Sequence, residues 1–389
     1  MSPLPPLSGL IAPGFESVRD AVIENFADGD ELGCQVAIFR RGDPVVDLCA
    51  GWSDRARKTE VAPETLFSVY SSGKAMAALV IAHLVEQGRL DYDRPVADIW
   101  PEFAAHGKAA LTLAQMMSHQ SGLVGITDPD FQPEDWIDFD KVVAILEDQE
   151  PLFEPGSQSG YHPVTFGFLA GEVARRADPQ SRRLGRILAE DLAEPANGGA
   201  GADVHIGIDP ADNARVAQLV KPRAMADLGP LTDAKRVAFL KPWSSPARVS
   251  GDVWREAELA GSNCQATAAG IGALMEAFAT GSAGGRKVLS EDVRAAATIS
   301  RTRGPNAVLP FTIDFAAGVM RNAPNFAYGP HPGTLGHSGW GGSAVFADPD
   351  TGLHGAYVMN RQREYLMGDP RANRVIAAAF DALDEKAES

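Results

Sequence analysis

The sequence predicts an α+β fold, with one antiparallel sheet formed by both chain ends, helices flanking the sheet, and a mainly helical domain inserted between the ends. Two observations predict it. Strand patterns are concentrated before residue 70 and after residue 314, and helical patterns dominate the residues between. We therefore expect residues 1–75 and 305–389 to form the sheet domain and residues 76–304 to form the helical domain.

The N-terminal part is expected to supply a helix and a hairpin. A helix is predicted over residues 15–26, and two apolar runs follow at residues 34–39 and 45–49. The residues between the runs include Gly42 and Pro44, which favour a turn, so the runs form a hairpin. Cys34 and Cys49 fall on these paired strands, but a total of three cysteines fits reduced thiols better than a disulfide framework.

Helical patterns then extend to about residue 305. A short strand at 65–69 leads into a helix whose apolar residues recur at helical spacing until Gly88. Further helices are predicted at 112–118, 141–149, 164–176, 182–192 and 267–280. Residues 221–264 have weak periodicity, and two interpretations stay open: they line or cover the mouth of a functional site, or they form an insertion without contact to a ligand.

Strand patterns return in the C-terminal part. They cover residues 315–321, 342–347 and 352–359, and Asp348 to Thr351 form a turn between the last two. A final helix is expected over residues 370–383, so the last part of the chain completes the sheet and packs a helix on it.

Composition excludes several classes of function. A formal charge of −16 and a pI near 4.9 repel polyanions, so no nucleic-acid partner is expected. No apolar run approaches membrane-spanning length. The first residues also lack the basic segment and the following apolar segment of a secretory signal peptide. We therefore expect no membrane partner and a cytoplasmic location. The histidines and cysteines show no zinc-ligand spacing, and we expect neither a metal nor a cofactor.

The most informative motif is Ser71-Ser72-Gly73-Lys74, where a strand gives way to a helix. Side chains three positions apart share a helix face, so Lys74 can activate the hydroxyl of Ser71 as a nucleophile. At such a junction the Ser71 backbone N–H can also point at a developing oxyanion. The alternative interpretation is a serine N-cap followed by a solvated lysine.

Two later segments support the nucleophile. Tyr161 ends a turn-rich loop just before a helix, and a nearby lysine ammonium would favour its phenolate or let the pair share a proton with the serine. The segment from Gly336 to Ser343 is rich in small residues, which let a substrate approach the backbone closely. Each segment also has a purely structural interpretation. Tyr161 would be a loop residue packed under a turn, and the segment from Gly336 to Ser343 would be a tight turn that leads into a strand.

Together these three segments resemble the serine hydrolase superfamily of class C β-lactamases, D-alanyl-D-alanine peptidases and family VIII carboxylesterases. The likeness covers nearly the whole chain. Residues 116–123 are similar to the superfamily's Leu-Leu-x-His-x-Ser-Gly-Leu stretch, and residues 153–156 form a further landmark. The resemblance implies a β-lactamase/transpeptidase-like fold with its active site at the interface of the two predicted domains.

The resemblance also implies roles. Ser71 would form the acyl-enzyme, Lys74 and Tyr161 would handle the proton, and the backbone amides of Ser71 and Trp340 would form the oxyanion hole. The side chains of His337 and Ser338 would line a third wall. The predicted substrate-binding residues are His337, Ser338, Gly339, Gly341 and Gly342.

Two departures from the β-lactamase pattern bear on the substrate. His162-Pro163 follows Tyr161 where the β-lactamases and peptidases have Tyr-x-Asn, so an amide that would hold Lys74 and the acylamino group of a β-lactam is missing. His337-Ser338-Gly339 stands in place of Lys-Thr-Gly, which weakens the positive charge that would bind a carboxylate there. Trp340-Gly341-Gly342 resembles the Trp-Gly-Gly motif of family VIII esterases. These changes favour an uncharged ester.

We therefore expect a serine carboxylesterase that hydrolyses small to medium-chain esters. No Gly-x-Ser-x-Gly occurs, so an α/β-hydrolase is not supported. A β-lactamase, a peptidase, an amide hydrolase or an acyltransferase of the same fold stays an alternative, as does a non-catalytic binding protein. Aromatic residues that could line the pocket or belong to the core are Phe131, Trp136, Phe153, Trp243, Trp254 and Phe311.

Overall fold

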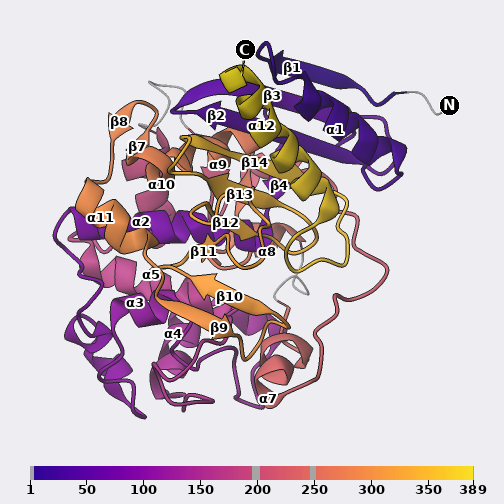
Figure 1. The fold of residues 1–389 in the computed structure, drawn as a ribbon. Helices are drawn as coiled ribbons and strands as arrows, with labels where there is room; N and C mark the ends of the chain where they lie inside the picture. Colours follow the sequence, from indigo (N-terminus) through magenta and orange to yellow (C-terminus); the bar gives the residue numbers. More distant parts are fainter. Residues whose placement is uncertain (1–3, 195–201, 246–250, 389) are drawn as a thin grey trace.

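A nine-stranded antiparallel sheet organises the molecule (Figure 1). The computed structural model describes residues 4–194, 202–245 and 251–388. In spatial order the strands are β1 (Leu7–Ile11), β3 (Asp43–Gly51), β2 (Gly33–Arg40), β14 (Leu353–Met359), β13 (Ala344–Ala347), β12 (Leu335–Ser338), β11 (Met320–Arg321), β10 (Thr312–Phe315) and β9 (Thr302–Pro305).

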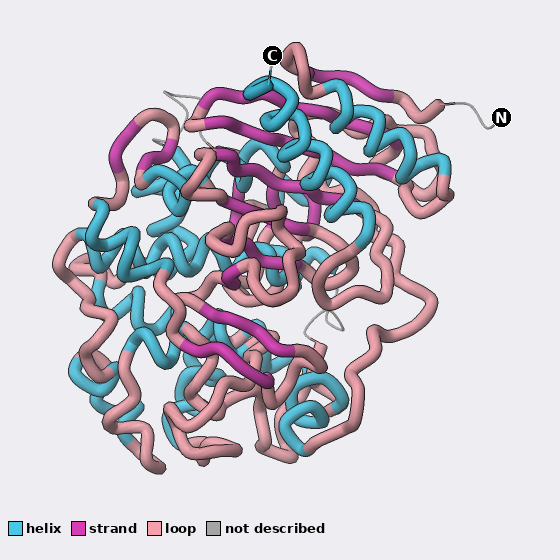
Figure 2. The backbone as a smooth tube through the Cα atoms, in the orientation of Figure 1, coloured by secondary structure: helices cyan, strands magenta, loops and turns pink. Residues whose placement is uncertain are grey.

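Helices cover both faces of the sheet and fill the part of the molecule below it (Figure 2). They are α1 (Glu16–Ala27), α2 (Lys74–Glu86), α3 (Leu113–Met117), α4 (Phe139–Asp148), α5 (Thr165–Ala177), α6 (Leu184–Ile187), α7 (Asp233–Lys235), α8 (Gly251–Glu256), α9 (Ala268–Leu274), α10 (Glu276–Thr280), α11 (Glu291–Thr298) and α12 (Pro370–Glu388). Two smaller sheets pair β4 (Phe67–Ser68), β6 (Gln265–Ala266) and β5 (Val204–His205), and β7 (Ser282–Ala283) with β8 (Arg286–Lys287).

The two chain ends meet at the centre of the sheet, as predicted. Strand β14 pairs with β2 from Leu353 opposite Arg40 to Met359 opposite Cys34. All seven residues of β14 are buried because α12 packs on one face, beside α1, and α9 packs on the other (Figure 1). The predicted α+β fold class is therefore confirmed.

Residues of β2 alternate between two hydrophobic clusters. Val36 and Ile38 belong to the cluster under α1 and α12, and Ala37 belongs to the larger cluster on the opposite face, which includes α2 and α5. The same alternation separates Cys34 from Cys49. Because Cys49 lies opposite Gln35 rather than Cys34, the two thiols point to opposite faces of the sheet, and both are free, as expected.

The structure corrects several predicted boundaries. The strand expected at 315–321 is a hairpin, in which Phe315 pairs with Met320 and the left-handed backbone of Gly318 (φ +92°) allows a tight turn. The helix expected at 267–280 is divided between α9 and α10, and strands β1, β9 and β12 were not predicted. The division at 76–304 stays a prediction, although α9 from that segment packs directly on β2 and β14.

The residues described include no helix with both the length and the apolar character needed to cross a membrane.

The turn that carries Ser71 lies against β6 and its preceding loop. A 3₁₀ turn, η1 (Tyr70–Gly73), ends where α2 begins. A Cβ atom placed on Gly73 would lie 2.3 Å from the Cβ of Cys264, so this position has no room for a side chain. The missing side chain at Gly73 therefore sets how closely η1 approaches residue 264.

Replacing Gly73 with alanine should separate these segments. We expect Gly73→Ala to lower the free energy of unfolding by about 1–3 kcal/mol through overpacking, measured by urea denaturation. Gly333→Ala is the matched control, because the nearest atom to its added Cβ is an Asp350 oxygen at 3.9 Å. Adding Cys264→Gly to Gly73→Ala should recover part of the loss, and strictly additive effects would contradict the proposed contact.

Candidate active site

Ser71 and Lys74 lie in contact at the start of α2. The Lys74 Nζ atom is 3.0 Å from the Ser71 Oγ atom. The alternative interpretation from the sequence is wrong on both points: the N-cap of α2 is Gly73 rather than Ser71, and Lys74 is fully buried rather than solvated. The two side chains are therefore held together inside the protein.

Lys74 is held by two backbone carbonyls. Its Nζ atom lies 2.8 Å from the Pro163 oxygen and 2.5 Å from the Gly261 oxygen. Burial lowers the pKa of Lys74 well below its ordinary 10.5 and so favours the neutral amine. A neutral amine has two N–H groups and one lone pair. Because both carbonyls only accept, they take the two N–H groups, and the lone pair is left facing the Ser71 hydroxyl.

Tyr161 completes the contact with the serine. Both residues line the same cavity, and the Tyr161 ring centroid lies 4.9 Å from the Lys74 Nζ atom. Burial raises the pKa of Tyr161, and its interaction with the Ser71 side chain offsets only part of this rise. The sequence argument assumed a lysine ammonium that would favour the phenolate. Since burial favours the neutral forms of both groups, the stronger proton acceptor here is the Lys74 amine.

Two backbone amides next to Ser71 are available to bind an oxyanion. Within the described residues, neither the Ser71 N–H nor the Trp340 N–H has a hydrogen-bond partner. The turn that carries Trp340 is fixed to the start of η1 because the Ser343 hydroxyl donates to the Val69 carbonyl (2.8 Å) and contacts the Ser72 hydroxyl (3.0 Å). A Cβ atom on Gly339 would lie 2.1 Å from the Val69 oxygen, so this contact requires glycine.

A second set of contacts holds the same turn from the other side. Gln362 donates to the Trp340 carbonyl (2.9 Å), and Arg371 donates to the Gly341 carbonyl (2.9 Å). Arg371 itself is buried in ion pairs with Asp369 (2.9 Å) and Glu31 (3.5 Å). These residues were not predicted from the sequence, because Gln362 and Arg371 lie outside every motif and donate hydrogen bonds to backbone atoms.

The predicted third wall is only partly exposed to the cavity. Ser338 lines it, whereas His337 is fully buried, does not line it, and donates from Nδ1 to the Ser338 carbonyl (3.0 Å). Burial lowers the pKa of His337 to about 3, so its imidazole is neutral. Gly341 and Gly342 have left-handed backbones (φ +89° and +131°) that shape the turn after Trp340, and neither lines the cavity.

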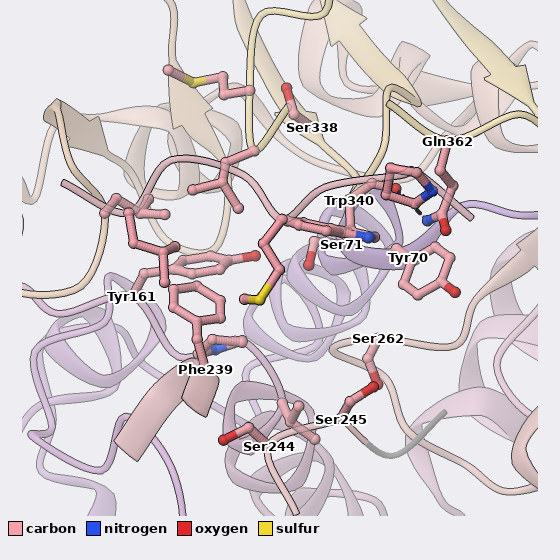
Figure 3. A pocket seen from close by; sticks show the side chains of 18 of the residues that line it. Tyr70, Ser71, Tyr161, Phe239, Ser244, Ser245, Ser262, Ser338, Trp340 and Gln362 are labelled. Carbon is pink, nitrogen blue, oxygen red and sulfur yellow. Dashed lines mark hydrogen bonds between the residues drawn. The ribbon is translucent and has the colours of Figure 1, made fainter. Parts of the chain in front are cut away.

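Ser71 and Tyr161 open into a cavity of about 450 Å³ (Figure 3). Residues 221–264 form much of its wall. One of the two interpretations of the sequence expected them to line the site in this way. Residues 246–250 lie outside the described part of the chain. Trp254 and Phe311 line the cavity, but Phe131, Trp136 and Trp243 pack against one another in the core. The lining residues from the excursion are Lys221, Pro222, Arg223, Ala224, Met225, Leu228, Phe239, Ser244, Ser245, Trp254 and Ser262.

The cavity wall also contains polar groups that are free to meet a ligand. The buried Ser262 hydroxyl and the Trp254 indole nitrogen have no hydrogen-bond partner in the described part of the chain. Among the described residues, the one group with metal-ligand geometry is His331, Asp348 and Asp350, and none of these lines the cavity.

Lys74 should control how fast Ser71 reacts. We expect Lys74→Met to slow covalent labelling by a fluorophosphonate about 10²–10⁴-fold, as for loss of a general base, and Ser71→Ala to abolish it. Labelling by the unmodified protein should rise with pH through a pKa well below 10.5, because the neutral amine is the active form. Lys108→Met is the control, since Lys108 is also buried and donates to two carbonyls, at Glu147 and Gln149. Rapid labelling of Lys74→Met would contradict this role.

Arg371 should stabilise both the fold and the Trp340 turn. Arg371→Met leaves Asp369 and Glu31 buried without their cation, so we expect a loss of about 3–5 kcal/mol in the free energy of unfolding. Arg19→Met should cost less than about 1 kcal/mol, because its ion pair with Asp20 is solvent-exposed. Chemical denaturation measures both losses. An equal loss in the free energy of unfolding for Arg371→Met and for the control Arg19→Met would contradict a stabilising role of the buried ion pairs of Arg371.

Comparisons with known proteins agree with this geometry. A penicillin-binding protein homologue from Caulobacter crescentus superposes with a TM-score of 0.92 at 47% identity, over 97% of this chain and 100% of the other. A family VIII carboxylesterase superposes with a TM-score of 0.90 at 39% identity, and the match covers 97% of this chain and 100% of the other. The Mycobacterium tuberculosis protein named esterase/beta-lactamase LipL is 33% identical over 91% of this chain and 82% of its own. The profile of the family described as Beta-lactamase matches residues 18–379. The chain is thus a serine hydrolase and belongs to the β-lactamase family.

Proposed function

We propose that this protein is a serine carboxylesterase that hydrolyses small to medium-chain esters through an acyl-enzyme on Ser71. The observation that carries the proposal is the desolvated Lys74 amine 3.0 Å from the Ser71 hydroxyl, with its two N–H groups directed at carbonyl oxygens. A base within hydrogen-bond distance is what a serine needs to become a nucleophile.

The reaction follows from these positions. Lys74 takes the proton of Ser71 as Oγ attacks the ester carbonyl, and the Ser71 and Trp340 amides hold the oxyanion. Tyr161, which lines the cavity with Ser71, passes a proton to the departing alkoxide and recovers one from Lys74. Water then enters, gives its proton to the same pair, and releases the acid by the reverse sequence of proton transfers.

Local chemistry supports an ester rather than a β-lactam or a peptide. Where the resemblance would place an asparagine, the Pro163 carbonyl holds Lys74, and a carbonyl cannot donate to the acylamino oxygen of a lactam. The neutral, buried His337 provides no charge for a carboxylate beside the scissile bond. One similar structure is a family VIII carboxylesterase, and the relative from M. tuberculosis has both activities in its name, so lactam cleavage needs a direct test.

The test compares p-nitrophenyl acetate, butyrate and octanoate with a chromogenic cephalosporin. We expect turnover of all three esters, because a cavity of about 450 Å³ has room for acyl chains of this length, and little cephalosporin cleavage. Ser71→Ala should reduce ester turnover by about 10³-fold or more, and the control is Ser157→Ala, at an exposed serine that does not line the cavity. Ester turnover that survives Ser71→Ala would exclude the nucleophile, and a preference for the cephalosporin would exclude the esterase assignment.

A further inference from the structure

A second cavity adjoins the one above Ser71. Its volume is about 460 Å³, and it shares four residues with the first: Lys221, Pro222, Arg223 and Gln362. We call this second cavity the basic chamber. Its remaining lining residues are Gly29, Asp30, Val220, Arg361, Arg363 and Glu364.

The basic chamber has an excess of unpaired cations. Arg363 is already paired with both of the chamber's carboxylates, Asp30 and Glu364. Lys221, Arg223 and Arg361 form no ion pair and no side-chain hydrogen bond with any described residue, and the Arg361 Nε atom is buried without a partner. This concentration of positive charge occurs in a chain whose formal charge is −16.

Lys221 and Arg223 are exposed and Arg361 is partly buried, so the three cations keep much of their hydration. They repel one another, and together they attract an anion into the cavity that they surround. Guanidinium groups present paired donors that match the geometry of carboxylate and phosphate oxygens. The continuity through Lys221, Arg223 and Gln362 means that one molecule can occupy both cavities. We propose that the basic chamber binds a carboxylate or phosphate group of the substrate while its ester lies at Ser71.

This inference rests on the proposed esterase function and defines its substrate class: an ester that is uncharged at the scissile bond and anionic at its far end. It refines the expectation of an uncharged ester. The neutral His337 lies beside Tyr161 (6.2 Å between ring centroids), whereas the unpaired cations line the adjoining basic chamber, with Lys221 and Arg223 where it meets the cavity.

The position of the chamber favours an anion on the acyl part. Tyr161 lies on one side of Ser71, and Tyr70 and Gln362 lie on the other (Figure 3). The alcohol must depart toward its proton donor, Tyr161. The acyl chain therefore extends toward Gln362 and the basic chamber.

The experiment measures kcat/KM for matched anionic and neutral esters. On the acyl side the pairs are the 4-nitrophenyl half-esters of adipate and suberate against 4-nitrophenyl hexanoate and octanoate. On the alcohol side the pair is 4-acetoxybenzoate against 4-acetoxybenzamide. The variants are Arg361→Gln and the double variant Lys221→Gln/Arg223→Gln. The control is Lys287→Gln, an exposed cation that lines neither cavity.

We expect the unmodified protein to prefer the anionic member of at least one pair by about fivefold or more, and salt to reduce this preference by screening. Both chamber variants should lower the preference toward one. Arg361→Gln, at a residue that lines only the basic chamber, should leave neutral-ester kcat/KM within about twofold, and Lys287→Gln should change neither quantity.

An unchanged preference in both chamber variants, or no preference in either pair, would overturn the inference while Ser71-dependent hydrolysis of the neutral esters left the esterase function intact. Neutral-ester hydrolysis that survives Ser71→Ala would instead overturn the proposed function.

Discussion

The site depends on one lysine that is buried without a carboxylate. Lys74 is surrounded by η1, by the loop before α5 and by the loop before β6, which provide the Ser71 hydroxyl and the carbonyls of Pro163 and Gly261. Burial is the cause of its lowered pKa, since no acidic group compensates it. An ammonium ion in this position is costly, and the neutral amine is a base. The desolvation that opposes the charge therefore leaves a basic amine 3.0 Å from the Ser71 hydroxyl.

Such a site requires segments that are distant in the sequence to be fixed with sub-ångström precision. Closure of the sheet by β2 and β14 brings the C-terminal strands beside the N-terminal ones and places β12 and the Trp340 turn against η1. The turn is then held between Ser343, bonded to Val69, and Arg371, bonded to Gly341. These contacts preorganise the two free amides, so binding an oxyanion requires little rearrangement.

The substrate cavity shows how a shared fold changes its chemistry. The fold retains the serine and lysine, yet a proline carbonyl replaces an expected amide donor and a neutral histidine replaces an expected lysine. Both changes remove groups that would bind a charged or amide-bearing substrate next to the scissile bond. Residues 221–264 line the cavity and also contribute Lys221 and Arg223 to the adjoining basic chamber, whereas the Ser71 and Lys74 side chains come from η1 and α2.

The sequence by itself predicted the features that depend on local pattern. Two apolar runs separated by turn residues indicated the hairpin of β2 and β3, and helical spacing indicated α2. The motif at Ser71 predicted a hydroxyl and an amine on one helix face, and the structure brings these two groups into contact. It could not predict β12 or the hairpin of β10 and β11, because strands of two to four residues carry too little periodicity and their pairing is decided by neighbours.

Only the tertiary structure decided the protonation states and the lining of the cavity. The sequence argument expected a lysine ammonium beside Tyr161, but the pKa of Lys74 depends on burial by segments far away in the chain. Likewise, the carbonyls of Pro163 and Gly261 and the clamp from Arg371 have no sequence signature, since every residue has a carbonyl group. Chemical identity is encoded locally, whereas desolvation and backbone contacts arise only when distant segments pack together.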